Sequence, residues 1–117
     1  MFAPTRIAVD YFFLQEFIMI LRMWHGYTAP QNADAYHAML QETILPGLDR
    51  VSGYRGAYVA RRHVENEVEF MTLTLWDSMD AVHAFSADGR AVIHKAAAPL
   101  LTHYDEYSIH YDGTFVP

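Results

Sequence analysis

The sequence predicts an α+β domain in which an antiparallel sheet carries helices on one face, and three observations support this prediction. The stretch Glu67–Trp76 alternates residue by residue, without glycine or proline, as a strand does. Both of its faces are largely apolar, which is typical of a strand covered on two sides. Asp77-Ser78 follows as a helix cap, and apolar residues then recur every three positions from Met79 to Phe85.

The first half of the chain predicts one strand and one helix. Phe17–His25 is an apolar run rich in strand-forming residues, and Gly26 follows it. Thr28–Gln31 has the spacing of a capping box with proline just inside the helix. Apolar residues at helical spacing continue to Ile44, and Pro46-Gly47 is expected to end this helix.

The second half predicts a hairpin, a helix and a last strand. Tyr54–His63 reads as the second strand, and the polar pair Glu65-Asn66 turns it into the strand that begins at Glu67. After the second helix, Arg90–Ala98 is expected to form a further helical turn or two, stopped by Pro99. His103–Tyr111 reads as one continuous final strand.

The resulting order β-α-β-β-α-β is the ferredoxin-like arrangement, a four-stranded antiparallel sheet with two helices on one face. The other face is expected to expose large apolar side chains: Ile18, Ile20, Trp24, Tyr58, Phe70 and Trp76. Such a patch is larger than a soluble monomer normally exposes. We therefore expect a homodimer, a dimeric α/β barrel, whose two sheets face each other and enclose a pocket.

Composition limits the classes of function. The chain of 117 residues is long enough for one domain, and 52% of its residues are hydrophobic. A net charge of −6 argues against a nucleic-acid partner, and the absence of cysteine excludes disulfides and thiolate metal sites. No apolar run reaches the length of a membrane span, and a cytoplasmic location is expected. Residues 1–16 read as an N-terminal extension, with Met19 as an alternative initiator, and residues 17–117 as the domain.

Five motifs together resemble the antibiotic biosynthesis monooxygenase domains of the dimeric α/β barrel superfamily. They are Ile20–Gly26, Asn32–Tyr36, Gly53–Ala57, Glu69-Phe70 with Leu75–Ser78, and Thr102–Tyr104. The resemblance covers about residues 18 to 111. It implies an oxygenase without metal or organic cofactor that uses dioxygen on an electron-rich phenolic or polycyclic aromatic substrate. Such a substrate, once deprotonated, can itself pass an electron to oxygen, so the protein must supply a base, an apolar aromatic pocket and shielding from water.

The sequence suggests residues for this site. Arg22 lies in an apolar strand, where it needs a carboxylate or a bound anionic oxygen, and a salt bridge across the dimer is the alternative. His103 opens the last strand and titrates near neutral pH, which suits a general acid or base, although a histidine bonded to backbone is the alternative. Trp24 and Trp76 suit either substrate contact or packing. The catalytic candidates are His103, His94 and Arg22; the substrate-binding candidates are Trp24, Tyr58, Phe70, Thr72, Trp76 and Phe85.

Haem degradation and non-catalytic binding are the competing functions. The seven histidines show no metal-ligand spacing, and no metal site is expected. The resemblance places His94 near the iron-ligating histidine of the haem-degrading relatives, if one residue is deleted after Phe85. Phe85 replaces their helix tryptophan, however, and Trp24 replaces their strand asparagine. A dimer that only binds a small ligand, or is purely structural, is the third candidate.

Overall fold

The computed structural model describes residues 18–117, and both the N-terminal extension and the start of the predicted domain at Phe17 lie outside these residues. Five strands and two α-helices are formed: β1 (Ile18–Thr28), α2 (Ala33–Met39), β2 (Tyr54–Val64), β3 (Glu67–Trp76), α3 (Met79–Phe85), β4 (Leu101–Tyr104) and β5 (Ile109–Thr114). The sheet order is β2-β3-β1-β4, every pair is antiparallel, and β5 also pairs with β1. The predicted ferredoxin-like α+β fold is confirmed.

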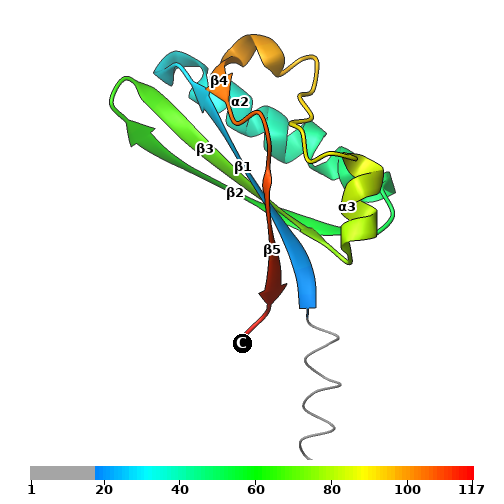
Figure 1. The fold of residues 1–117 in the computed structure, drawn as a ribbon. Helices are drawn as coiled ribbons and strands as arrows, with labels where there is room; N and C mark the ends of the chain where they lie inside the picture. Colours follow the sequence, from blue (N-terminus) through cyan, green and yellow to red (C-terminus); the bar gives the residue numbers. More distant parts are fainter. Residues whose placement is uncertain (1–17) are drawn as a thin grey trace, which may run out of the picture.

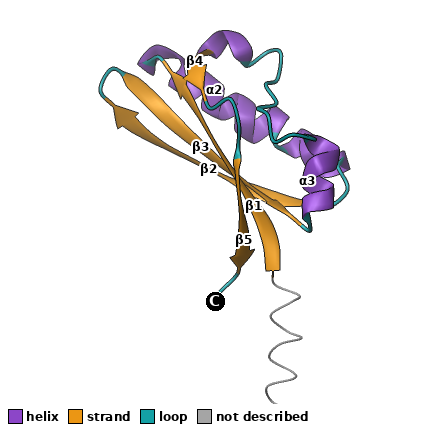
Figure 2. Ribbon diagram, viewed as in Figure 1, coloured by secondary structure: helices purple, strands orange, loops and turns teal. Residues whose placement is uncertain are grey.

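The helices cover one face of the strongly twisted sheet (Figures 1 and 2). Within the described residues, no helix is long and apolar enough to cross a membrane. The two central strands, β1 and β3, alternate strictly between buried and half-buried positions along most of their length. The buried set of each strand packs under the helices, so this set decides what the helices cover.

The predicted assignment of side chains to the two faces is wrong. Ile20, Trp24, Phe70 and Trp76 were expected on the helix-free face, yet all four are buried on the helix side. The helix-free face instead carries the half-buried residues of the same strands. Across four strands, Tyr58, Leu73, Met23 and Ile109 form one row, and Leu75, Leu21 and Tyr111 form the next. Both faces are apolar, so alternation alone does not show which one the helices choose.

The first helical region is longer and less regular than predicted. Thr28 does not cap it, because this residue ends β1 with its side chain fully buried. A 3₁₀ turn (Pro30–Asn32) leads into α2, which continues as a π-helical turn (Leu40–Ile44) closed by the bond from Leu45 N–H to the Leu40 carbonyl. Pro46 does not end the helical region, since a 3₁₀ helix runs from Pro46 to Arg50.

The second half also departs from the prediction. Residues 91–94 have no regular secondary structure, and the helix predicted for Arg90–Ala98 is replaced by a 3₁₀ turn, Ala98–Leu100, that contains Pro99. The last strand is broken into β4 and β5. Residues 106–108 leave β1 and bond to the segment 89–91 through Ala91 N–H to Glu106 O and Ser108 N–H to Gly89 O. This pairing ties the segment 86–94, which we call the strap, to the C-terminal strands.

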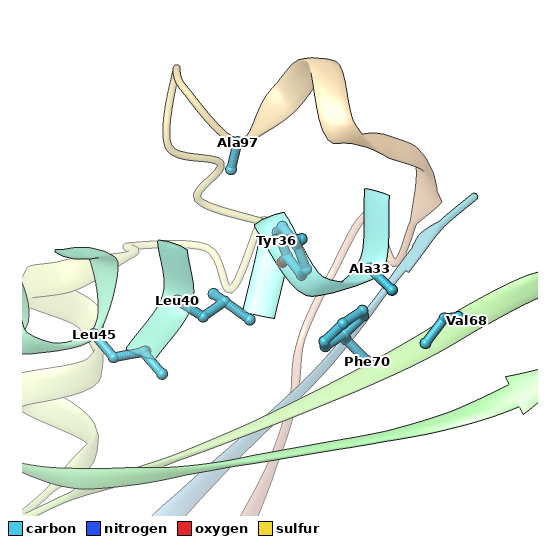
Figure 3. Packing of buried hydrophobic residues seen from close by; sticks show 7 residues of the cluster. All are labelled: Ala33, Tyr36, Leu40, Leu45, Val68, Phe70 and Ala97. Atoms are coloured by element: carbon cyan, nitrogen blue, oxygen red, sulfur yellow. The ribbon is translucent and has the colours of Figure 1, made fainter. Parts of the chain in front are cut away.

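The core lies between β3 and the first helical region (Figure 3). Phe70 is fully buried and meets Tyr36 edge-on, with ring centroids 4.8 Å apart. A second cluster joins Ile20, Trp76 and Val82 beneath α3. The predicted cap of α3 is confirmed, since the Ala81 N–H donates to Ser78 Oγ at 3.2 Å.

The corrected faces predict very different costs for two aromatic truncations. Phe70→Ala empties a site in the core and is expected to lower the free energy of unfolding by about 3–5 kcal/mol. Tyr58→Ala removes a ring that is 66% exposed on the opposite face, and is expected to cost under about 1 kcal/mol. Urea unfolding of both variants measures this, and equal losses would contradict the assignment.

Candidate functional site

A cavity of about 450 Å³ lies between the helix side of the sheet and the helical layer, a size suited to a small organic molecule. Its floor comes from β1 and β3, its roof from α2, the π turn and the 3₁₀ helix Pro46–Arg50, and its open side from α3 and the strap. The cavity is contained in one chain, on the helix side of the sheet. The pocket expected between the facing sheets of a dimer stays a prediction, since this cavity is formed by a single chain.

Arg22 is the charged residue of the cavity floor. It is 6% exposed, and within the described residues its guanidinium makes one hydrogen bond, from Nη2 to the Arg90 carbonyl at 3.3 Å. Its Nε is buried without a partner, and no carboxylate of residues 18–117 pairs with it. Burial lowers the pKa of Arg22 from its usual value, the effect expected when a cation loses water without gaining an anion. Its guanidinium carbon lies 5.1 Å from the centre of the Phe85 ring.

Two threonines of β3 lie beside Arg22 on the same face. Thr74 faces Arg22 across the strands, accepts from Trp76 Nε1 at 2.8 Å and donates to the Arg22 carbonyl at 3.4 Å. Thr72 faces Trp24 and is 8% exposed, but its buried Oγ1 has no partner among the described residues. Two neighbouring polar groups of the floor, Arg22 Nε and Thr72 Oγ1, are thus unsatisfied.

The positive charge of Arg22 affects the pKa of a histidine in the neighbouring strand β5. Burial lowers the pKa of His110, which pairs with Arg22 in β5, and the charges of Arg22 and His83 lower it further. Burial also raises the pKa of Tyr36 to about 12. This phenol lines the cavity and stays protonated near neutral pH, so it can donate a hydrogen bond but cannot act as a base.

The mouth of the cavity is formed by its exposed lining residues, Thr43, Gly47 and Arg50 on the helical side and Val92 and His94 on the strap. The ring of His94 has a defined tautomer, because the Ala96 N–H donates to Nδ1 at 3.1 Å. A neutral His94 therefore carries its proton on Nε2 and offers a donor. Arg50 forms no ion pair within the described part of the chain.

The charge of the lining is one-sided. Arg22 and Arg50 contribute to it, and no aspartate or glutamate of the described residues does, although the whole sequence has 14 acids against 8 lysines and arginines. An acidic protein therefore contains a cavity whose ionised side chains are all cationic, which favours an anionic ligand.

The structure brings five of the nine predicted site residues to the cavity: Arg22, Trp24, Thr72, Phe85 and His94. Trp24 is held by its indole N–H, which donates to the Asp105 carbonyl at 2.7 Å. Phe70 and Trp76 lie on the same face but are fully buried in the core, and Tyr58 lies on the opposite face.

His103 lies outside the cavity. It stacks on Tyr27 with ring centroids 4.0 Å apart, and its Nε2 is 2.8 Å from Glu67 Oε1. Both partners are side chains of the sheet, so the alternative bond to backbone is not what the structure shows. The general-base role predicted for His103 has no support from this placement.

Several lining residues of the cavity were not predicted from the sequence. Tyr36 follows the helical spacing of the core, and strand alternation puts Thr74 on the same face as Thr72, so both could have been found once the face was known. Arg50 and Ile93 carry no such signal, because they lie in segments whose conformation was mispredicted or not predicted.

The fold defines a class of structure, the antibiotic biosynthesis monooxygenase fold. A Streptomyces coelicolor monooxygenase from the gene ActVA-Orf6, in complex with nanaomycin D, is 13% identical with a TM-score of 0.59, over 87% of this chain and 95% of its own. A Bacillus cereus protein named as an antibiotic biosynthesis monooxygenase is 14% identical with a TM-score of 0.58, over 85% and 94%. The haem degrader MhuD of Mycobacterium tuberculosis, with two haems in its active site, is 15% identical with a TM-score of 0.54, over 83% and 98%.

These similarities establish a shared fold. No family model and no curated protein matches the sequence. The predicted resemblance is thereby confirmed for the fold. The similarities do not identify a reaction for this chain.

The unpaired cation predicts an unusual effect on stability. Replacing Arg22 by Met keeps most of the side-chain volume and removes a buried charge that has no counter-ion in the described part of the chain. Burying an unpaired charge is unfavourable. Without ligand, the Arg22→Met variant is therefore expected to unfold at the same or a higher urea concentration than wild type, with a free energy of unfolding higher by up to roughly 1 kcal/mol. Arg55→Met is the matched control, since Arg55 is largely exposed and pairs with Asp77 at 3.1 Å. A loss above about 2 kcal/mol for Arg22→Met would show that the arginine mainly holds the strap.

Proposed function

We propose that this protein is a cofactor-independent monooxygenase that oxidises a small electron-rich phenol or polycyclic hydroxyarene in its helix-side cavity. The observation that carries the proposal is Arg22, a buried cation without a carboxylate partner among residues 18–117, in a cavity walled by Trp24 and Phe85. A phenolate supplies the missing negative charge, and aromatic walls suit its ring. The shared fold with a monooxygenase is consistent with this proposal.

Arg22 would favour the reactive form of the substrate. A cation in a desolvated site stabilises a bound phenolate and lowers the pKa of the phenol. Neither Tyr36 nor His94 is available to accept the phenolic proton. Tyr36 stays protonated, and Nδ1 of His94 already accepts a hydrogen bond from the Ala96 N–H. The phenolic proton therefore leaves to solvent, driven by the field of Arg22.

The reaction can be written with the atoms balanced. The phenolate gives one electron to dioxygen, and the resulting radical pair forms a C–O bond at the carbon para to the oxygen. Loss of the ring hydrogen as a proton and cleavage of the O–O bond then give a quinone and one water. We assign the protonation of the departing hydroxide to the Nε2–H of His94, which solvent then restores.

Two measurements test this proposal with a naphthol or anthrol panel. Product should form only with dioxygen, and ¹⁸O₂ should place one labelled atom in the quinone. Arg22→Met is expected to lower kcat/KM by roughly ten- to a hundredfold, Arg22→Lys by less, and Arg55→Met not at all. Ligand binding without oxygen consumption would contradict the proposal and favour a non-catalytic binding protein.

Haem binding is the alternative, and the bonding of His94 does not suit it. A histidine that ligates a metal usually donates its other ring N–H to an acceptor. In this structure Nδ1 instead accepts from the Ala96 N–H, so Nε2 carries the hydrogen where iron would bind. No step of the reaction is therefore assigned to haem.

A haem titration examines this alternative directly. We expect no stoichiometric Soret shift, and the same weak spectrum from wild type and His94→Ala. A saturable shift that disappears in His94→Ala would establish haem as the ligand and remove the argument from the tautomer.

A further inference from the structure

The cavity has a second cationic position, at its mouth, that the proposed reaction does not use. Arg50 ends the 3₁₀ helix Pro46–Arg50, lines the cavity, is exposed, and has no ion-pair partner among residues 18–117. The other arginines of the described chain differ from it. Arg55, Arg61, Arg62 and Arg90 each pair with an aspartate or glutamate within 4 Å. Only the two cavity arginines, Arg22 and Arg50, lack such a partner in this part of the chain.

We propose that the site binds an aromatic hydroxy acid, with its phenolic oxygen at Arg22 and Thr72 on the floor and its carboxylate at Arg50 in the mouth. The inference rests on the proposed function for the inner oxygen and adds the second acidic group. The floor offers buried polar groups to a ligand. Arg22 and Thr72 are each more than nine-tenths buried, and each has a polar atom without a partner among the described residues. The Arg22 guanidinium N–H and the Thr72 hydroxyl can both donate hydrogen bonds, so they suit one phenolic oxygen as their common acceptor.

The mouth suits a carboxylate for a different reason. Arg50 supplies a planar guanidinium that carboxylates bind through two parallel hydrogen bonds. His94, the other polar ring at the mouth, offers its Nε2–H as a donor in the observed tautomer. No acidic side chain of the described residues lines the cavity to compete with the ligand. A neutral phenol would leave both mouth donors to water.

The polarity along the cavity also fixes the orientation of such a ligand. Arg22 on the floor is desolvated, so it favours the phenol, which ionises when a nearby cation lowers its pKa. Arg50 is exposed and favours the carboxylate, which is already charged in water. The same cavity is lined by apolar side chains that include Trp24, Leu40 and Phe85, which suit the ring system. The inner oxygen activates the ring, and the outer carboxylate selects the substrate.

Calorimetry without oxygen tests the inference with three matched ligands: a hydroxynaphthoic acid, its methyl ester and the parent naphthol. Wild type is expected to bind the acid roughly three- to tenfold more tightly than the ester, as a partly exposed charge pair allows. Arg50→Gln should abolish this preference, whereas Arg55→Gln should keep it. Because Arg50 is exposed, its preference should also shrink at high salt.

The outcomes separate this inference from the proposed reaction. Equal affinity for acid and ester in wild type, no measurable binding of the acid, or an acid preference that survives in Arg50→Gln would each overturn it. If the naphthol is nevertheless oxidised by dioxygen, the monooxygenase proposal stands alone. An Arg50-dependent preference without any oxygen consumption would instead confirm the ligand class and reject the reaction.

Discussion

The organisation of the site depends on one electrostatic constraint: a guanidinium is buried on the helix side of the sheet, and no carboxylate of the described residues pairs with it. Removing a cation from water is unfavourable unless an anion replaces the lost hydration. Arg22 receives only partial compensation, from the carbonyl of Arg90 and from the face of Phe85. The same carbonyl accepts from Ser86 Oγ at 2.8 Å, a bond within the strap, so Arg22 shares this acceptor with Ser86. The floor of the cavity therefore contains a charged group whose Nε has no partner among the described residues.

The space around this charge results from departures from regular structure. A continuous α-helix over the sheet would bring its side chains down at even spacing and fill the layer. Here the π turn at Leu40–Ile44 and the 3₁₀ helix at Pro46–Arg50 change the helical pitch, and both segments line the cavity. The strap has no regular secondary structure where a helix was predicted, and Val92, Ile93 and His94 line the open side of the cavity. Such irregular turns are frequent at functional sites.

The sequence predicted the fold because its local signals agree with one another. Strand alternation in Glu67–Trp76, the turn at Glu65-Asn66 and the cap at Ser78 all appear in the structure. The choice of face was not encoded locally. Met23 and Leu73 are as apolar as Trp24 and Phe70, so only packing against the helices decides which set is buried. The break of the last strand was equally hidden, since it depends on residues 106–108 pairing with the strap far away in sequence.

Part of the site was nevertheless predictable, because a charged residue in an apolar strand is informative on either face. Arg22 needs an anionic partner whether helices or a second sheet cover it, and the structure removes the alternative of a carboxylate from its own described chain. Histidines were less informative, since their roles follow from their hydrogen bonds. His103 is engaged by Glu67, and His94 by the Ala96 N–H. A histidine therefore acquires a chemical role only when both ring nitrogens have been assigned, which neither composition nor spacing can do.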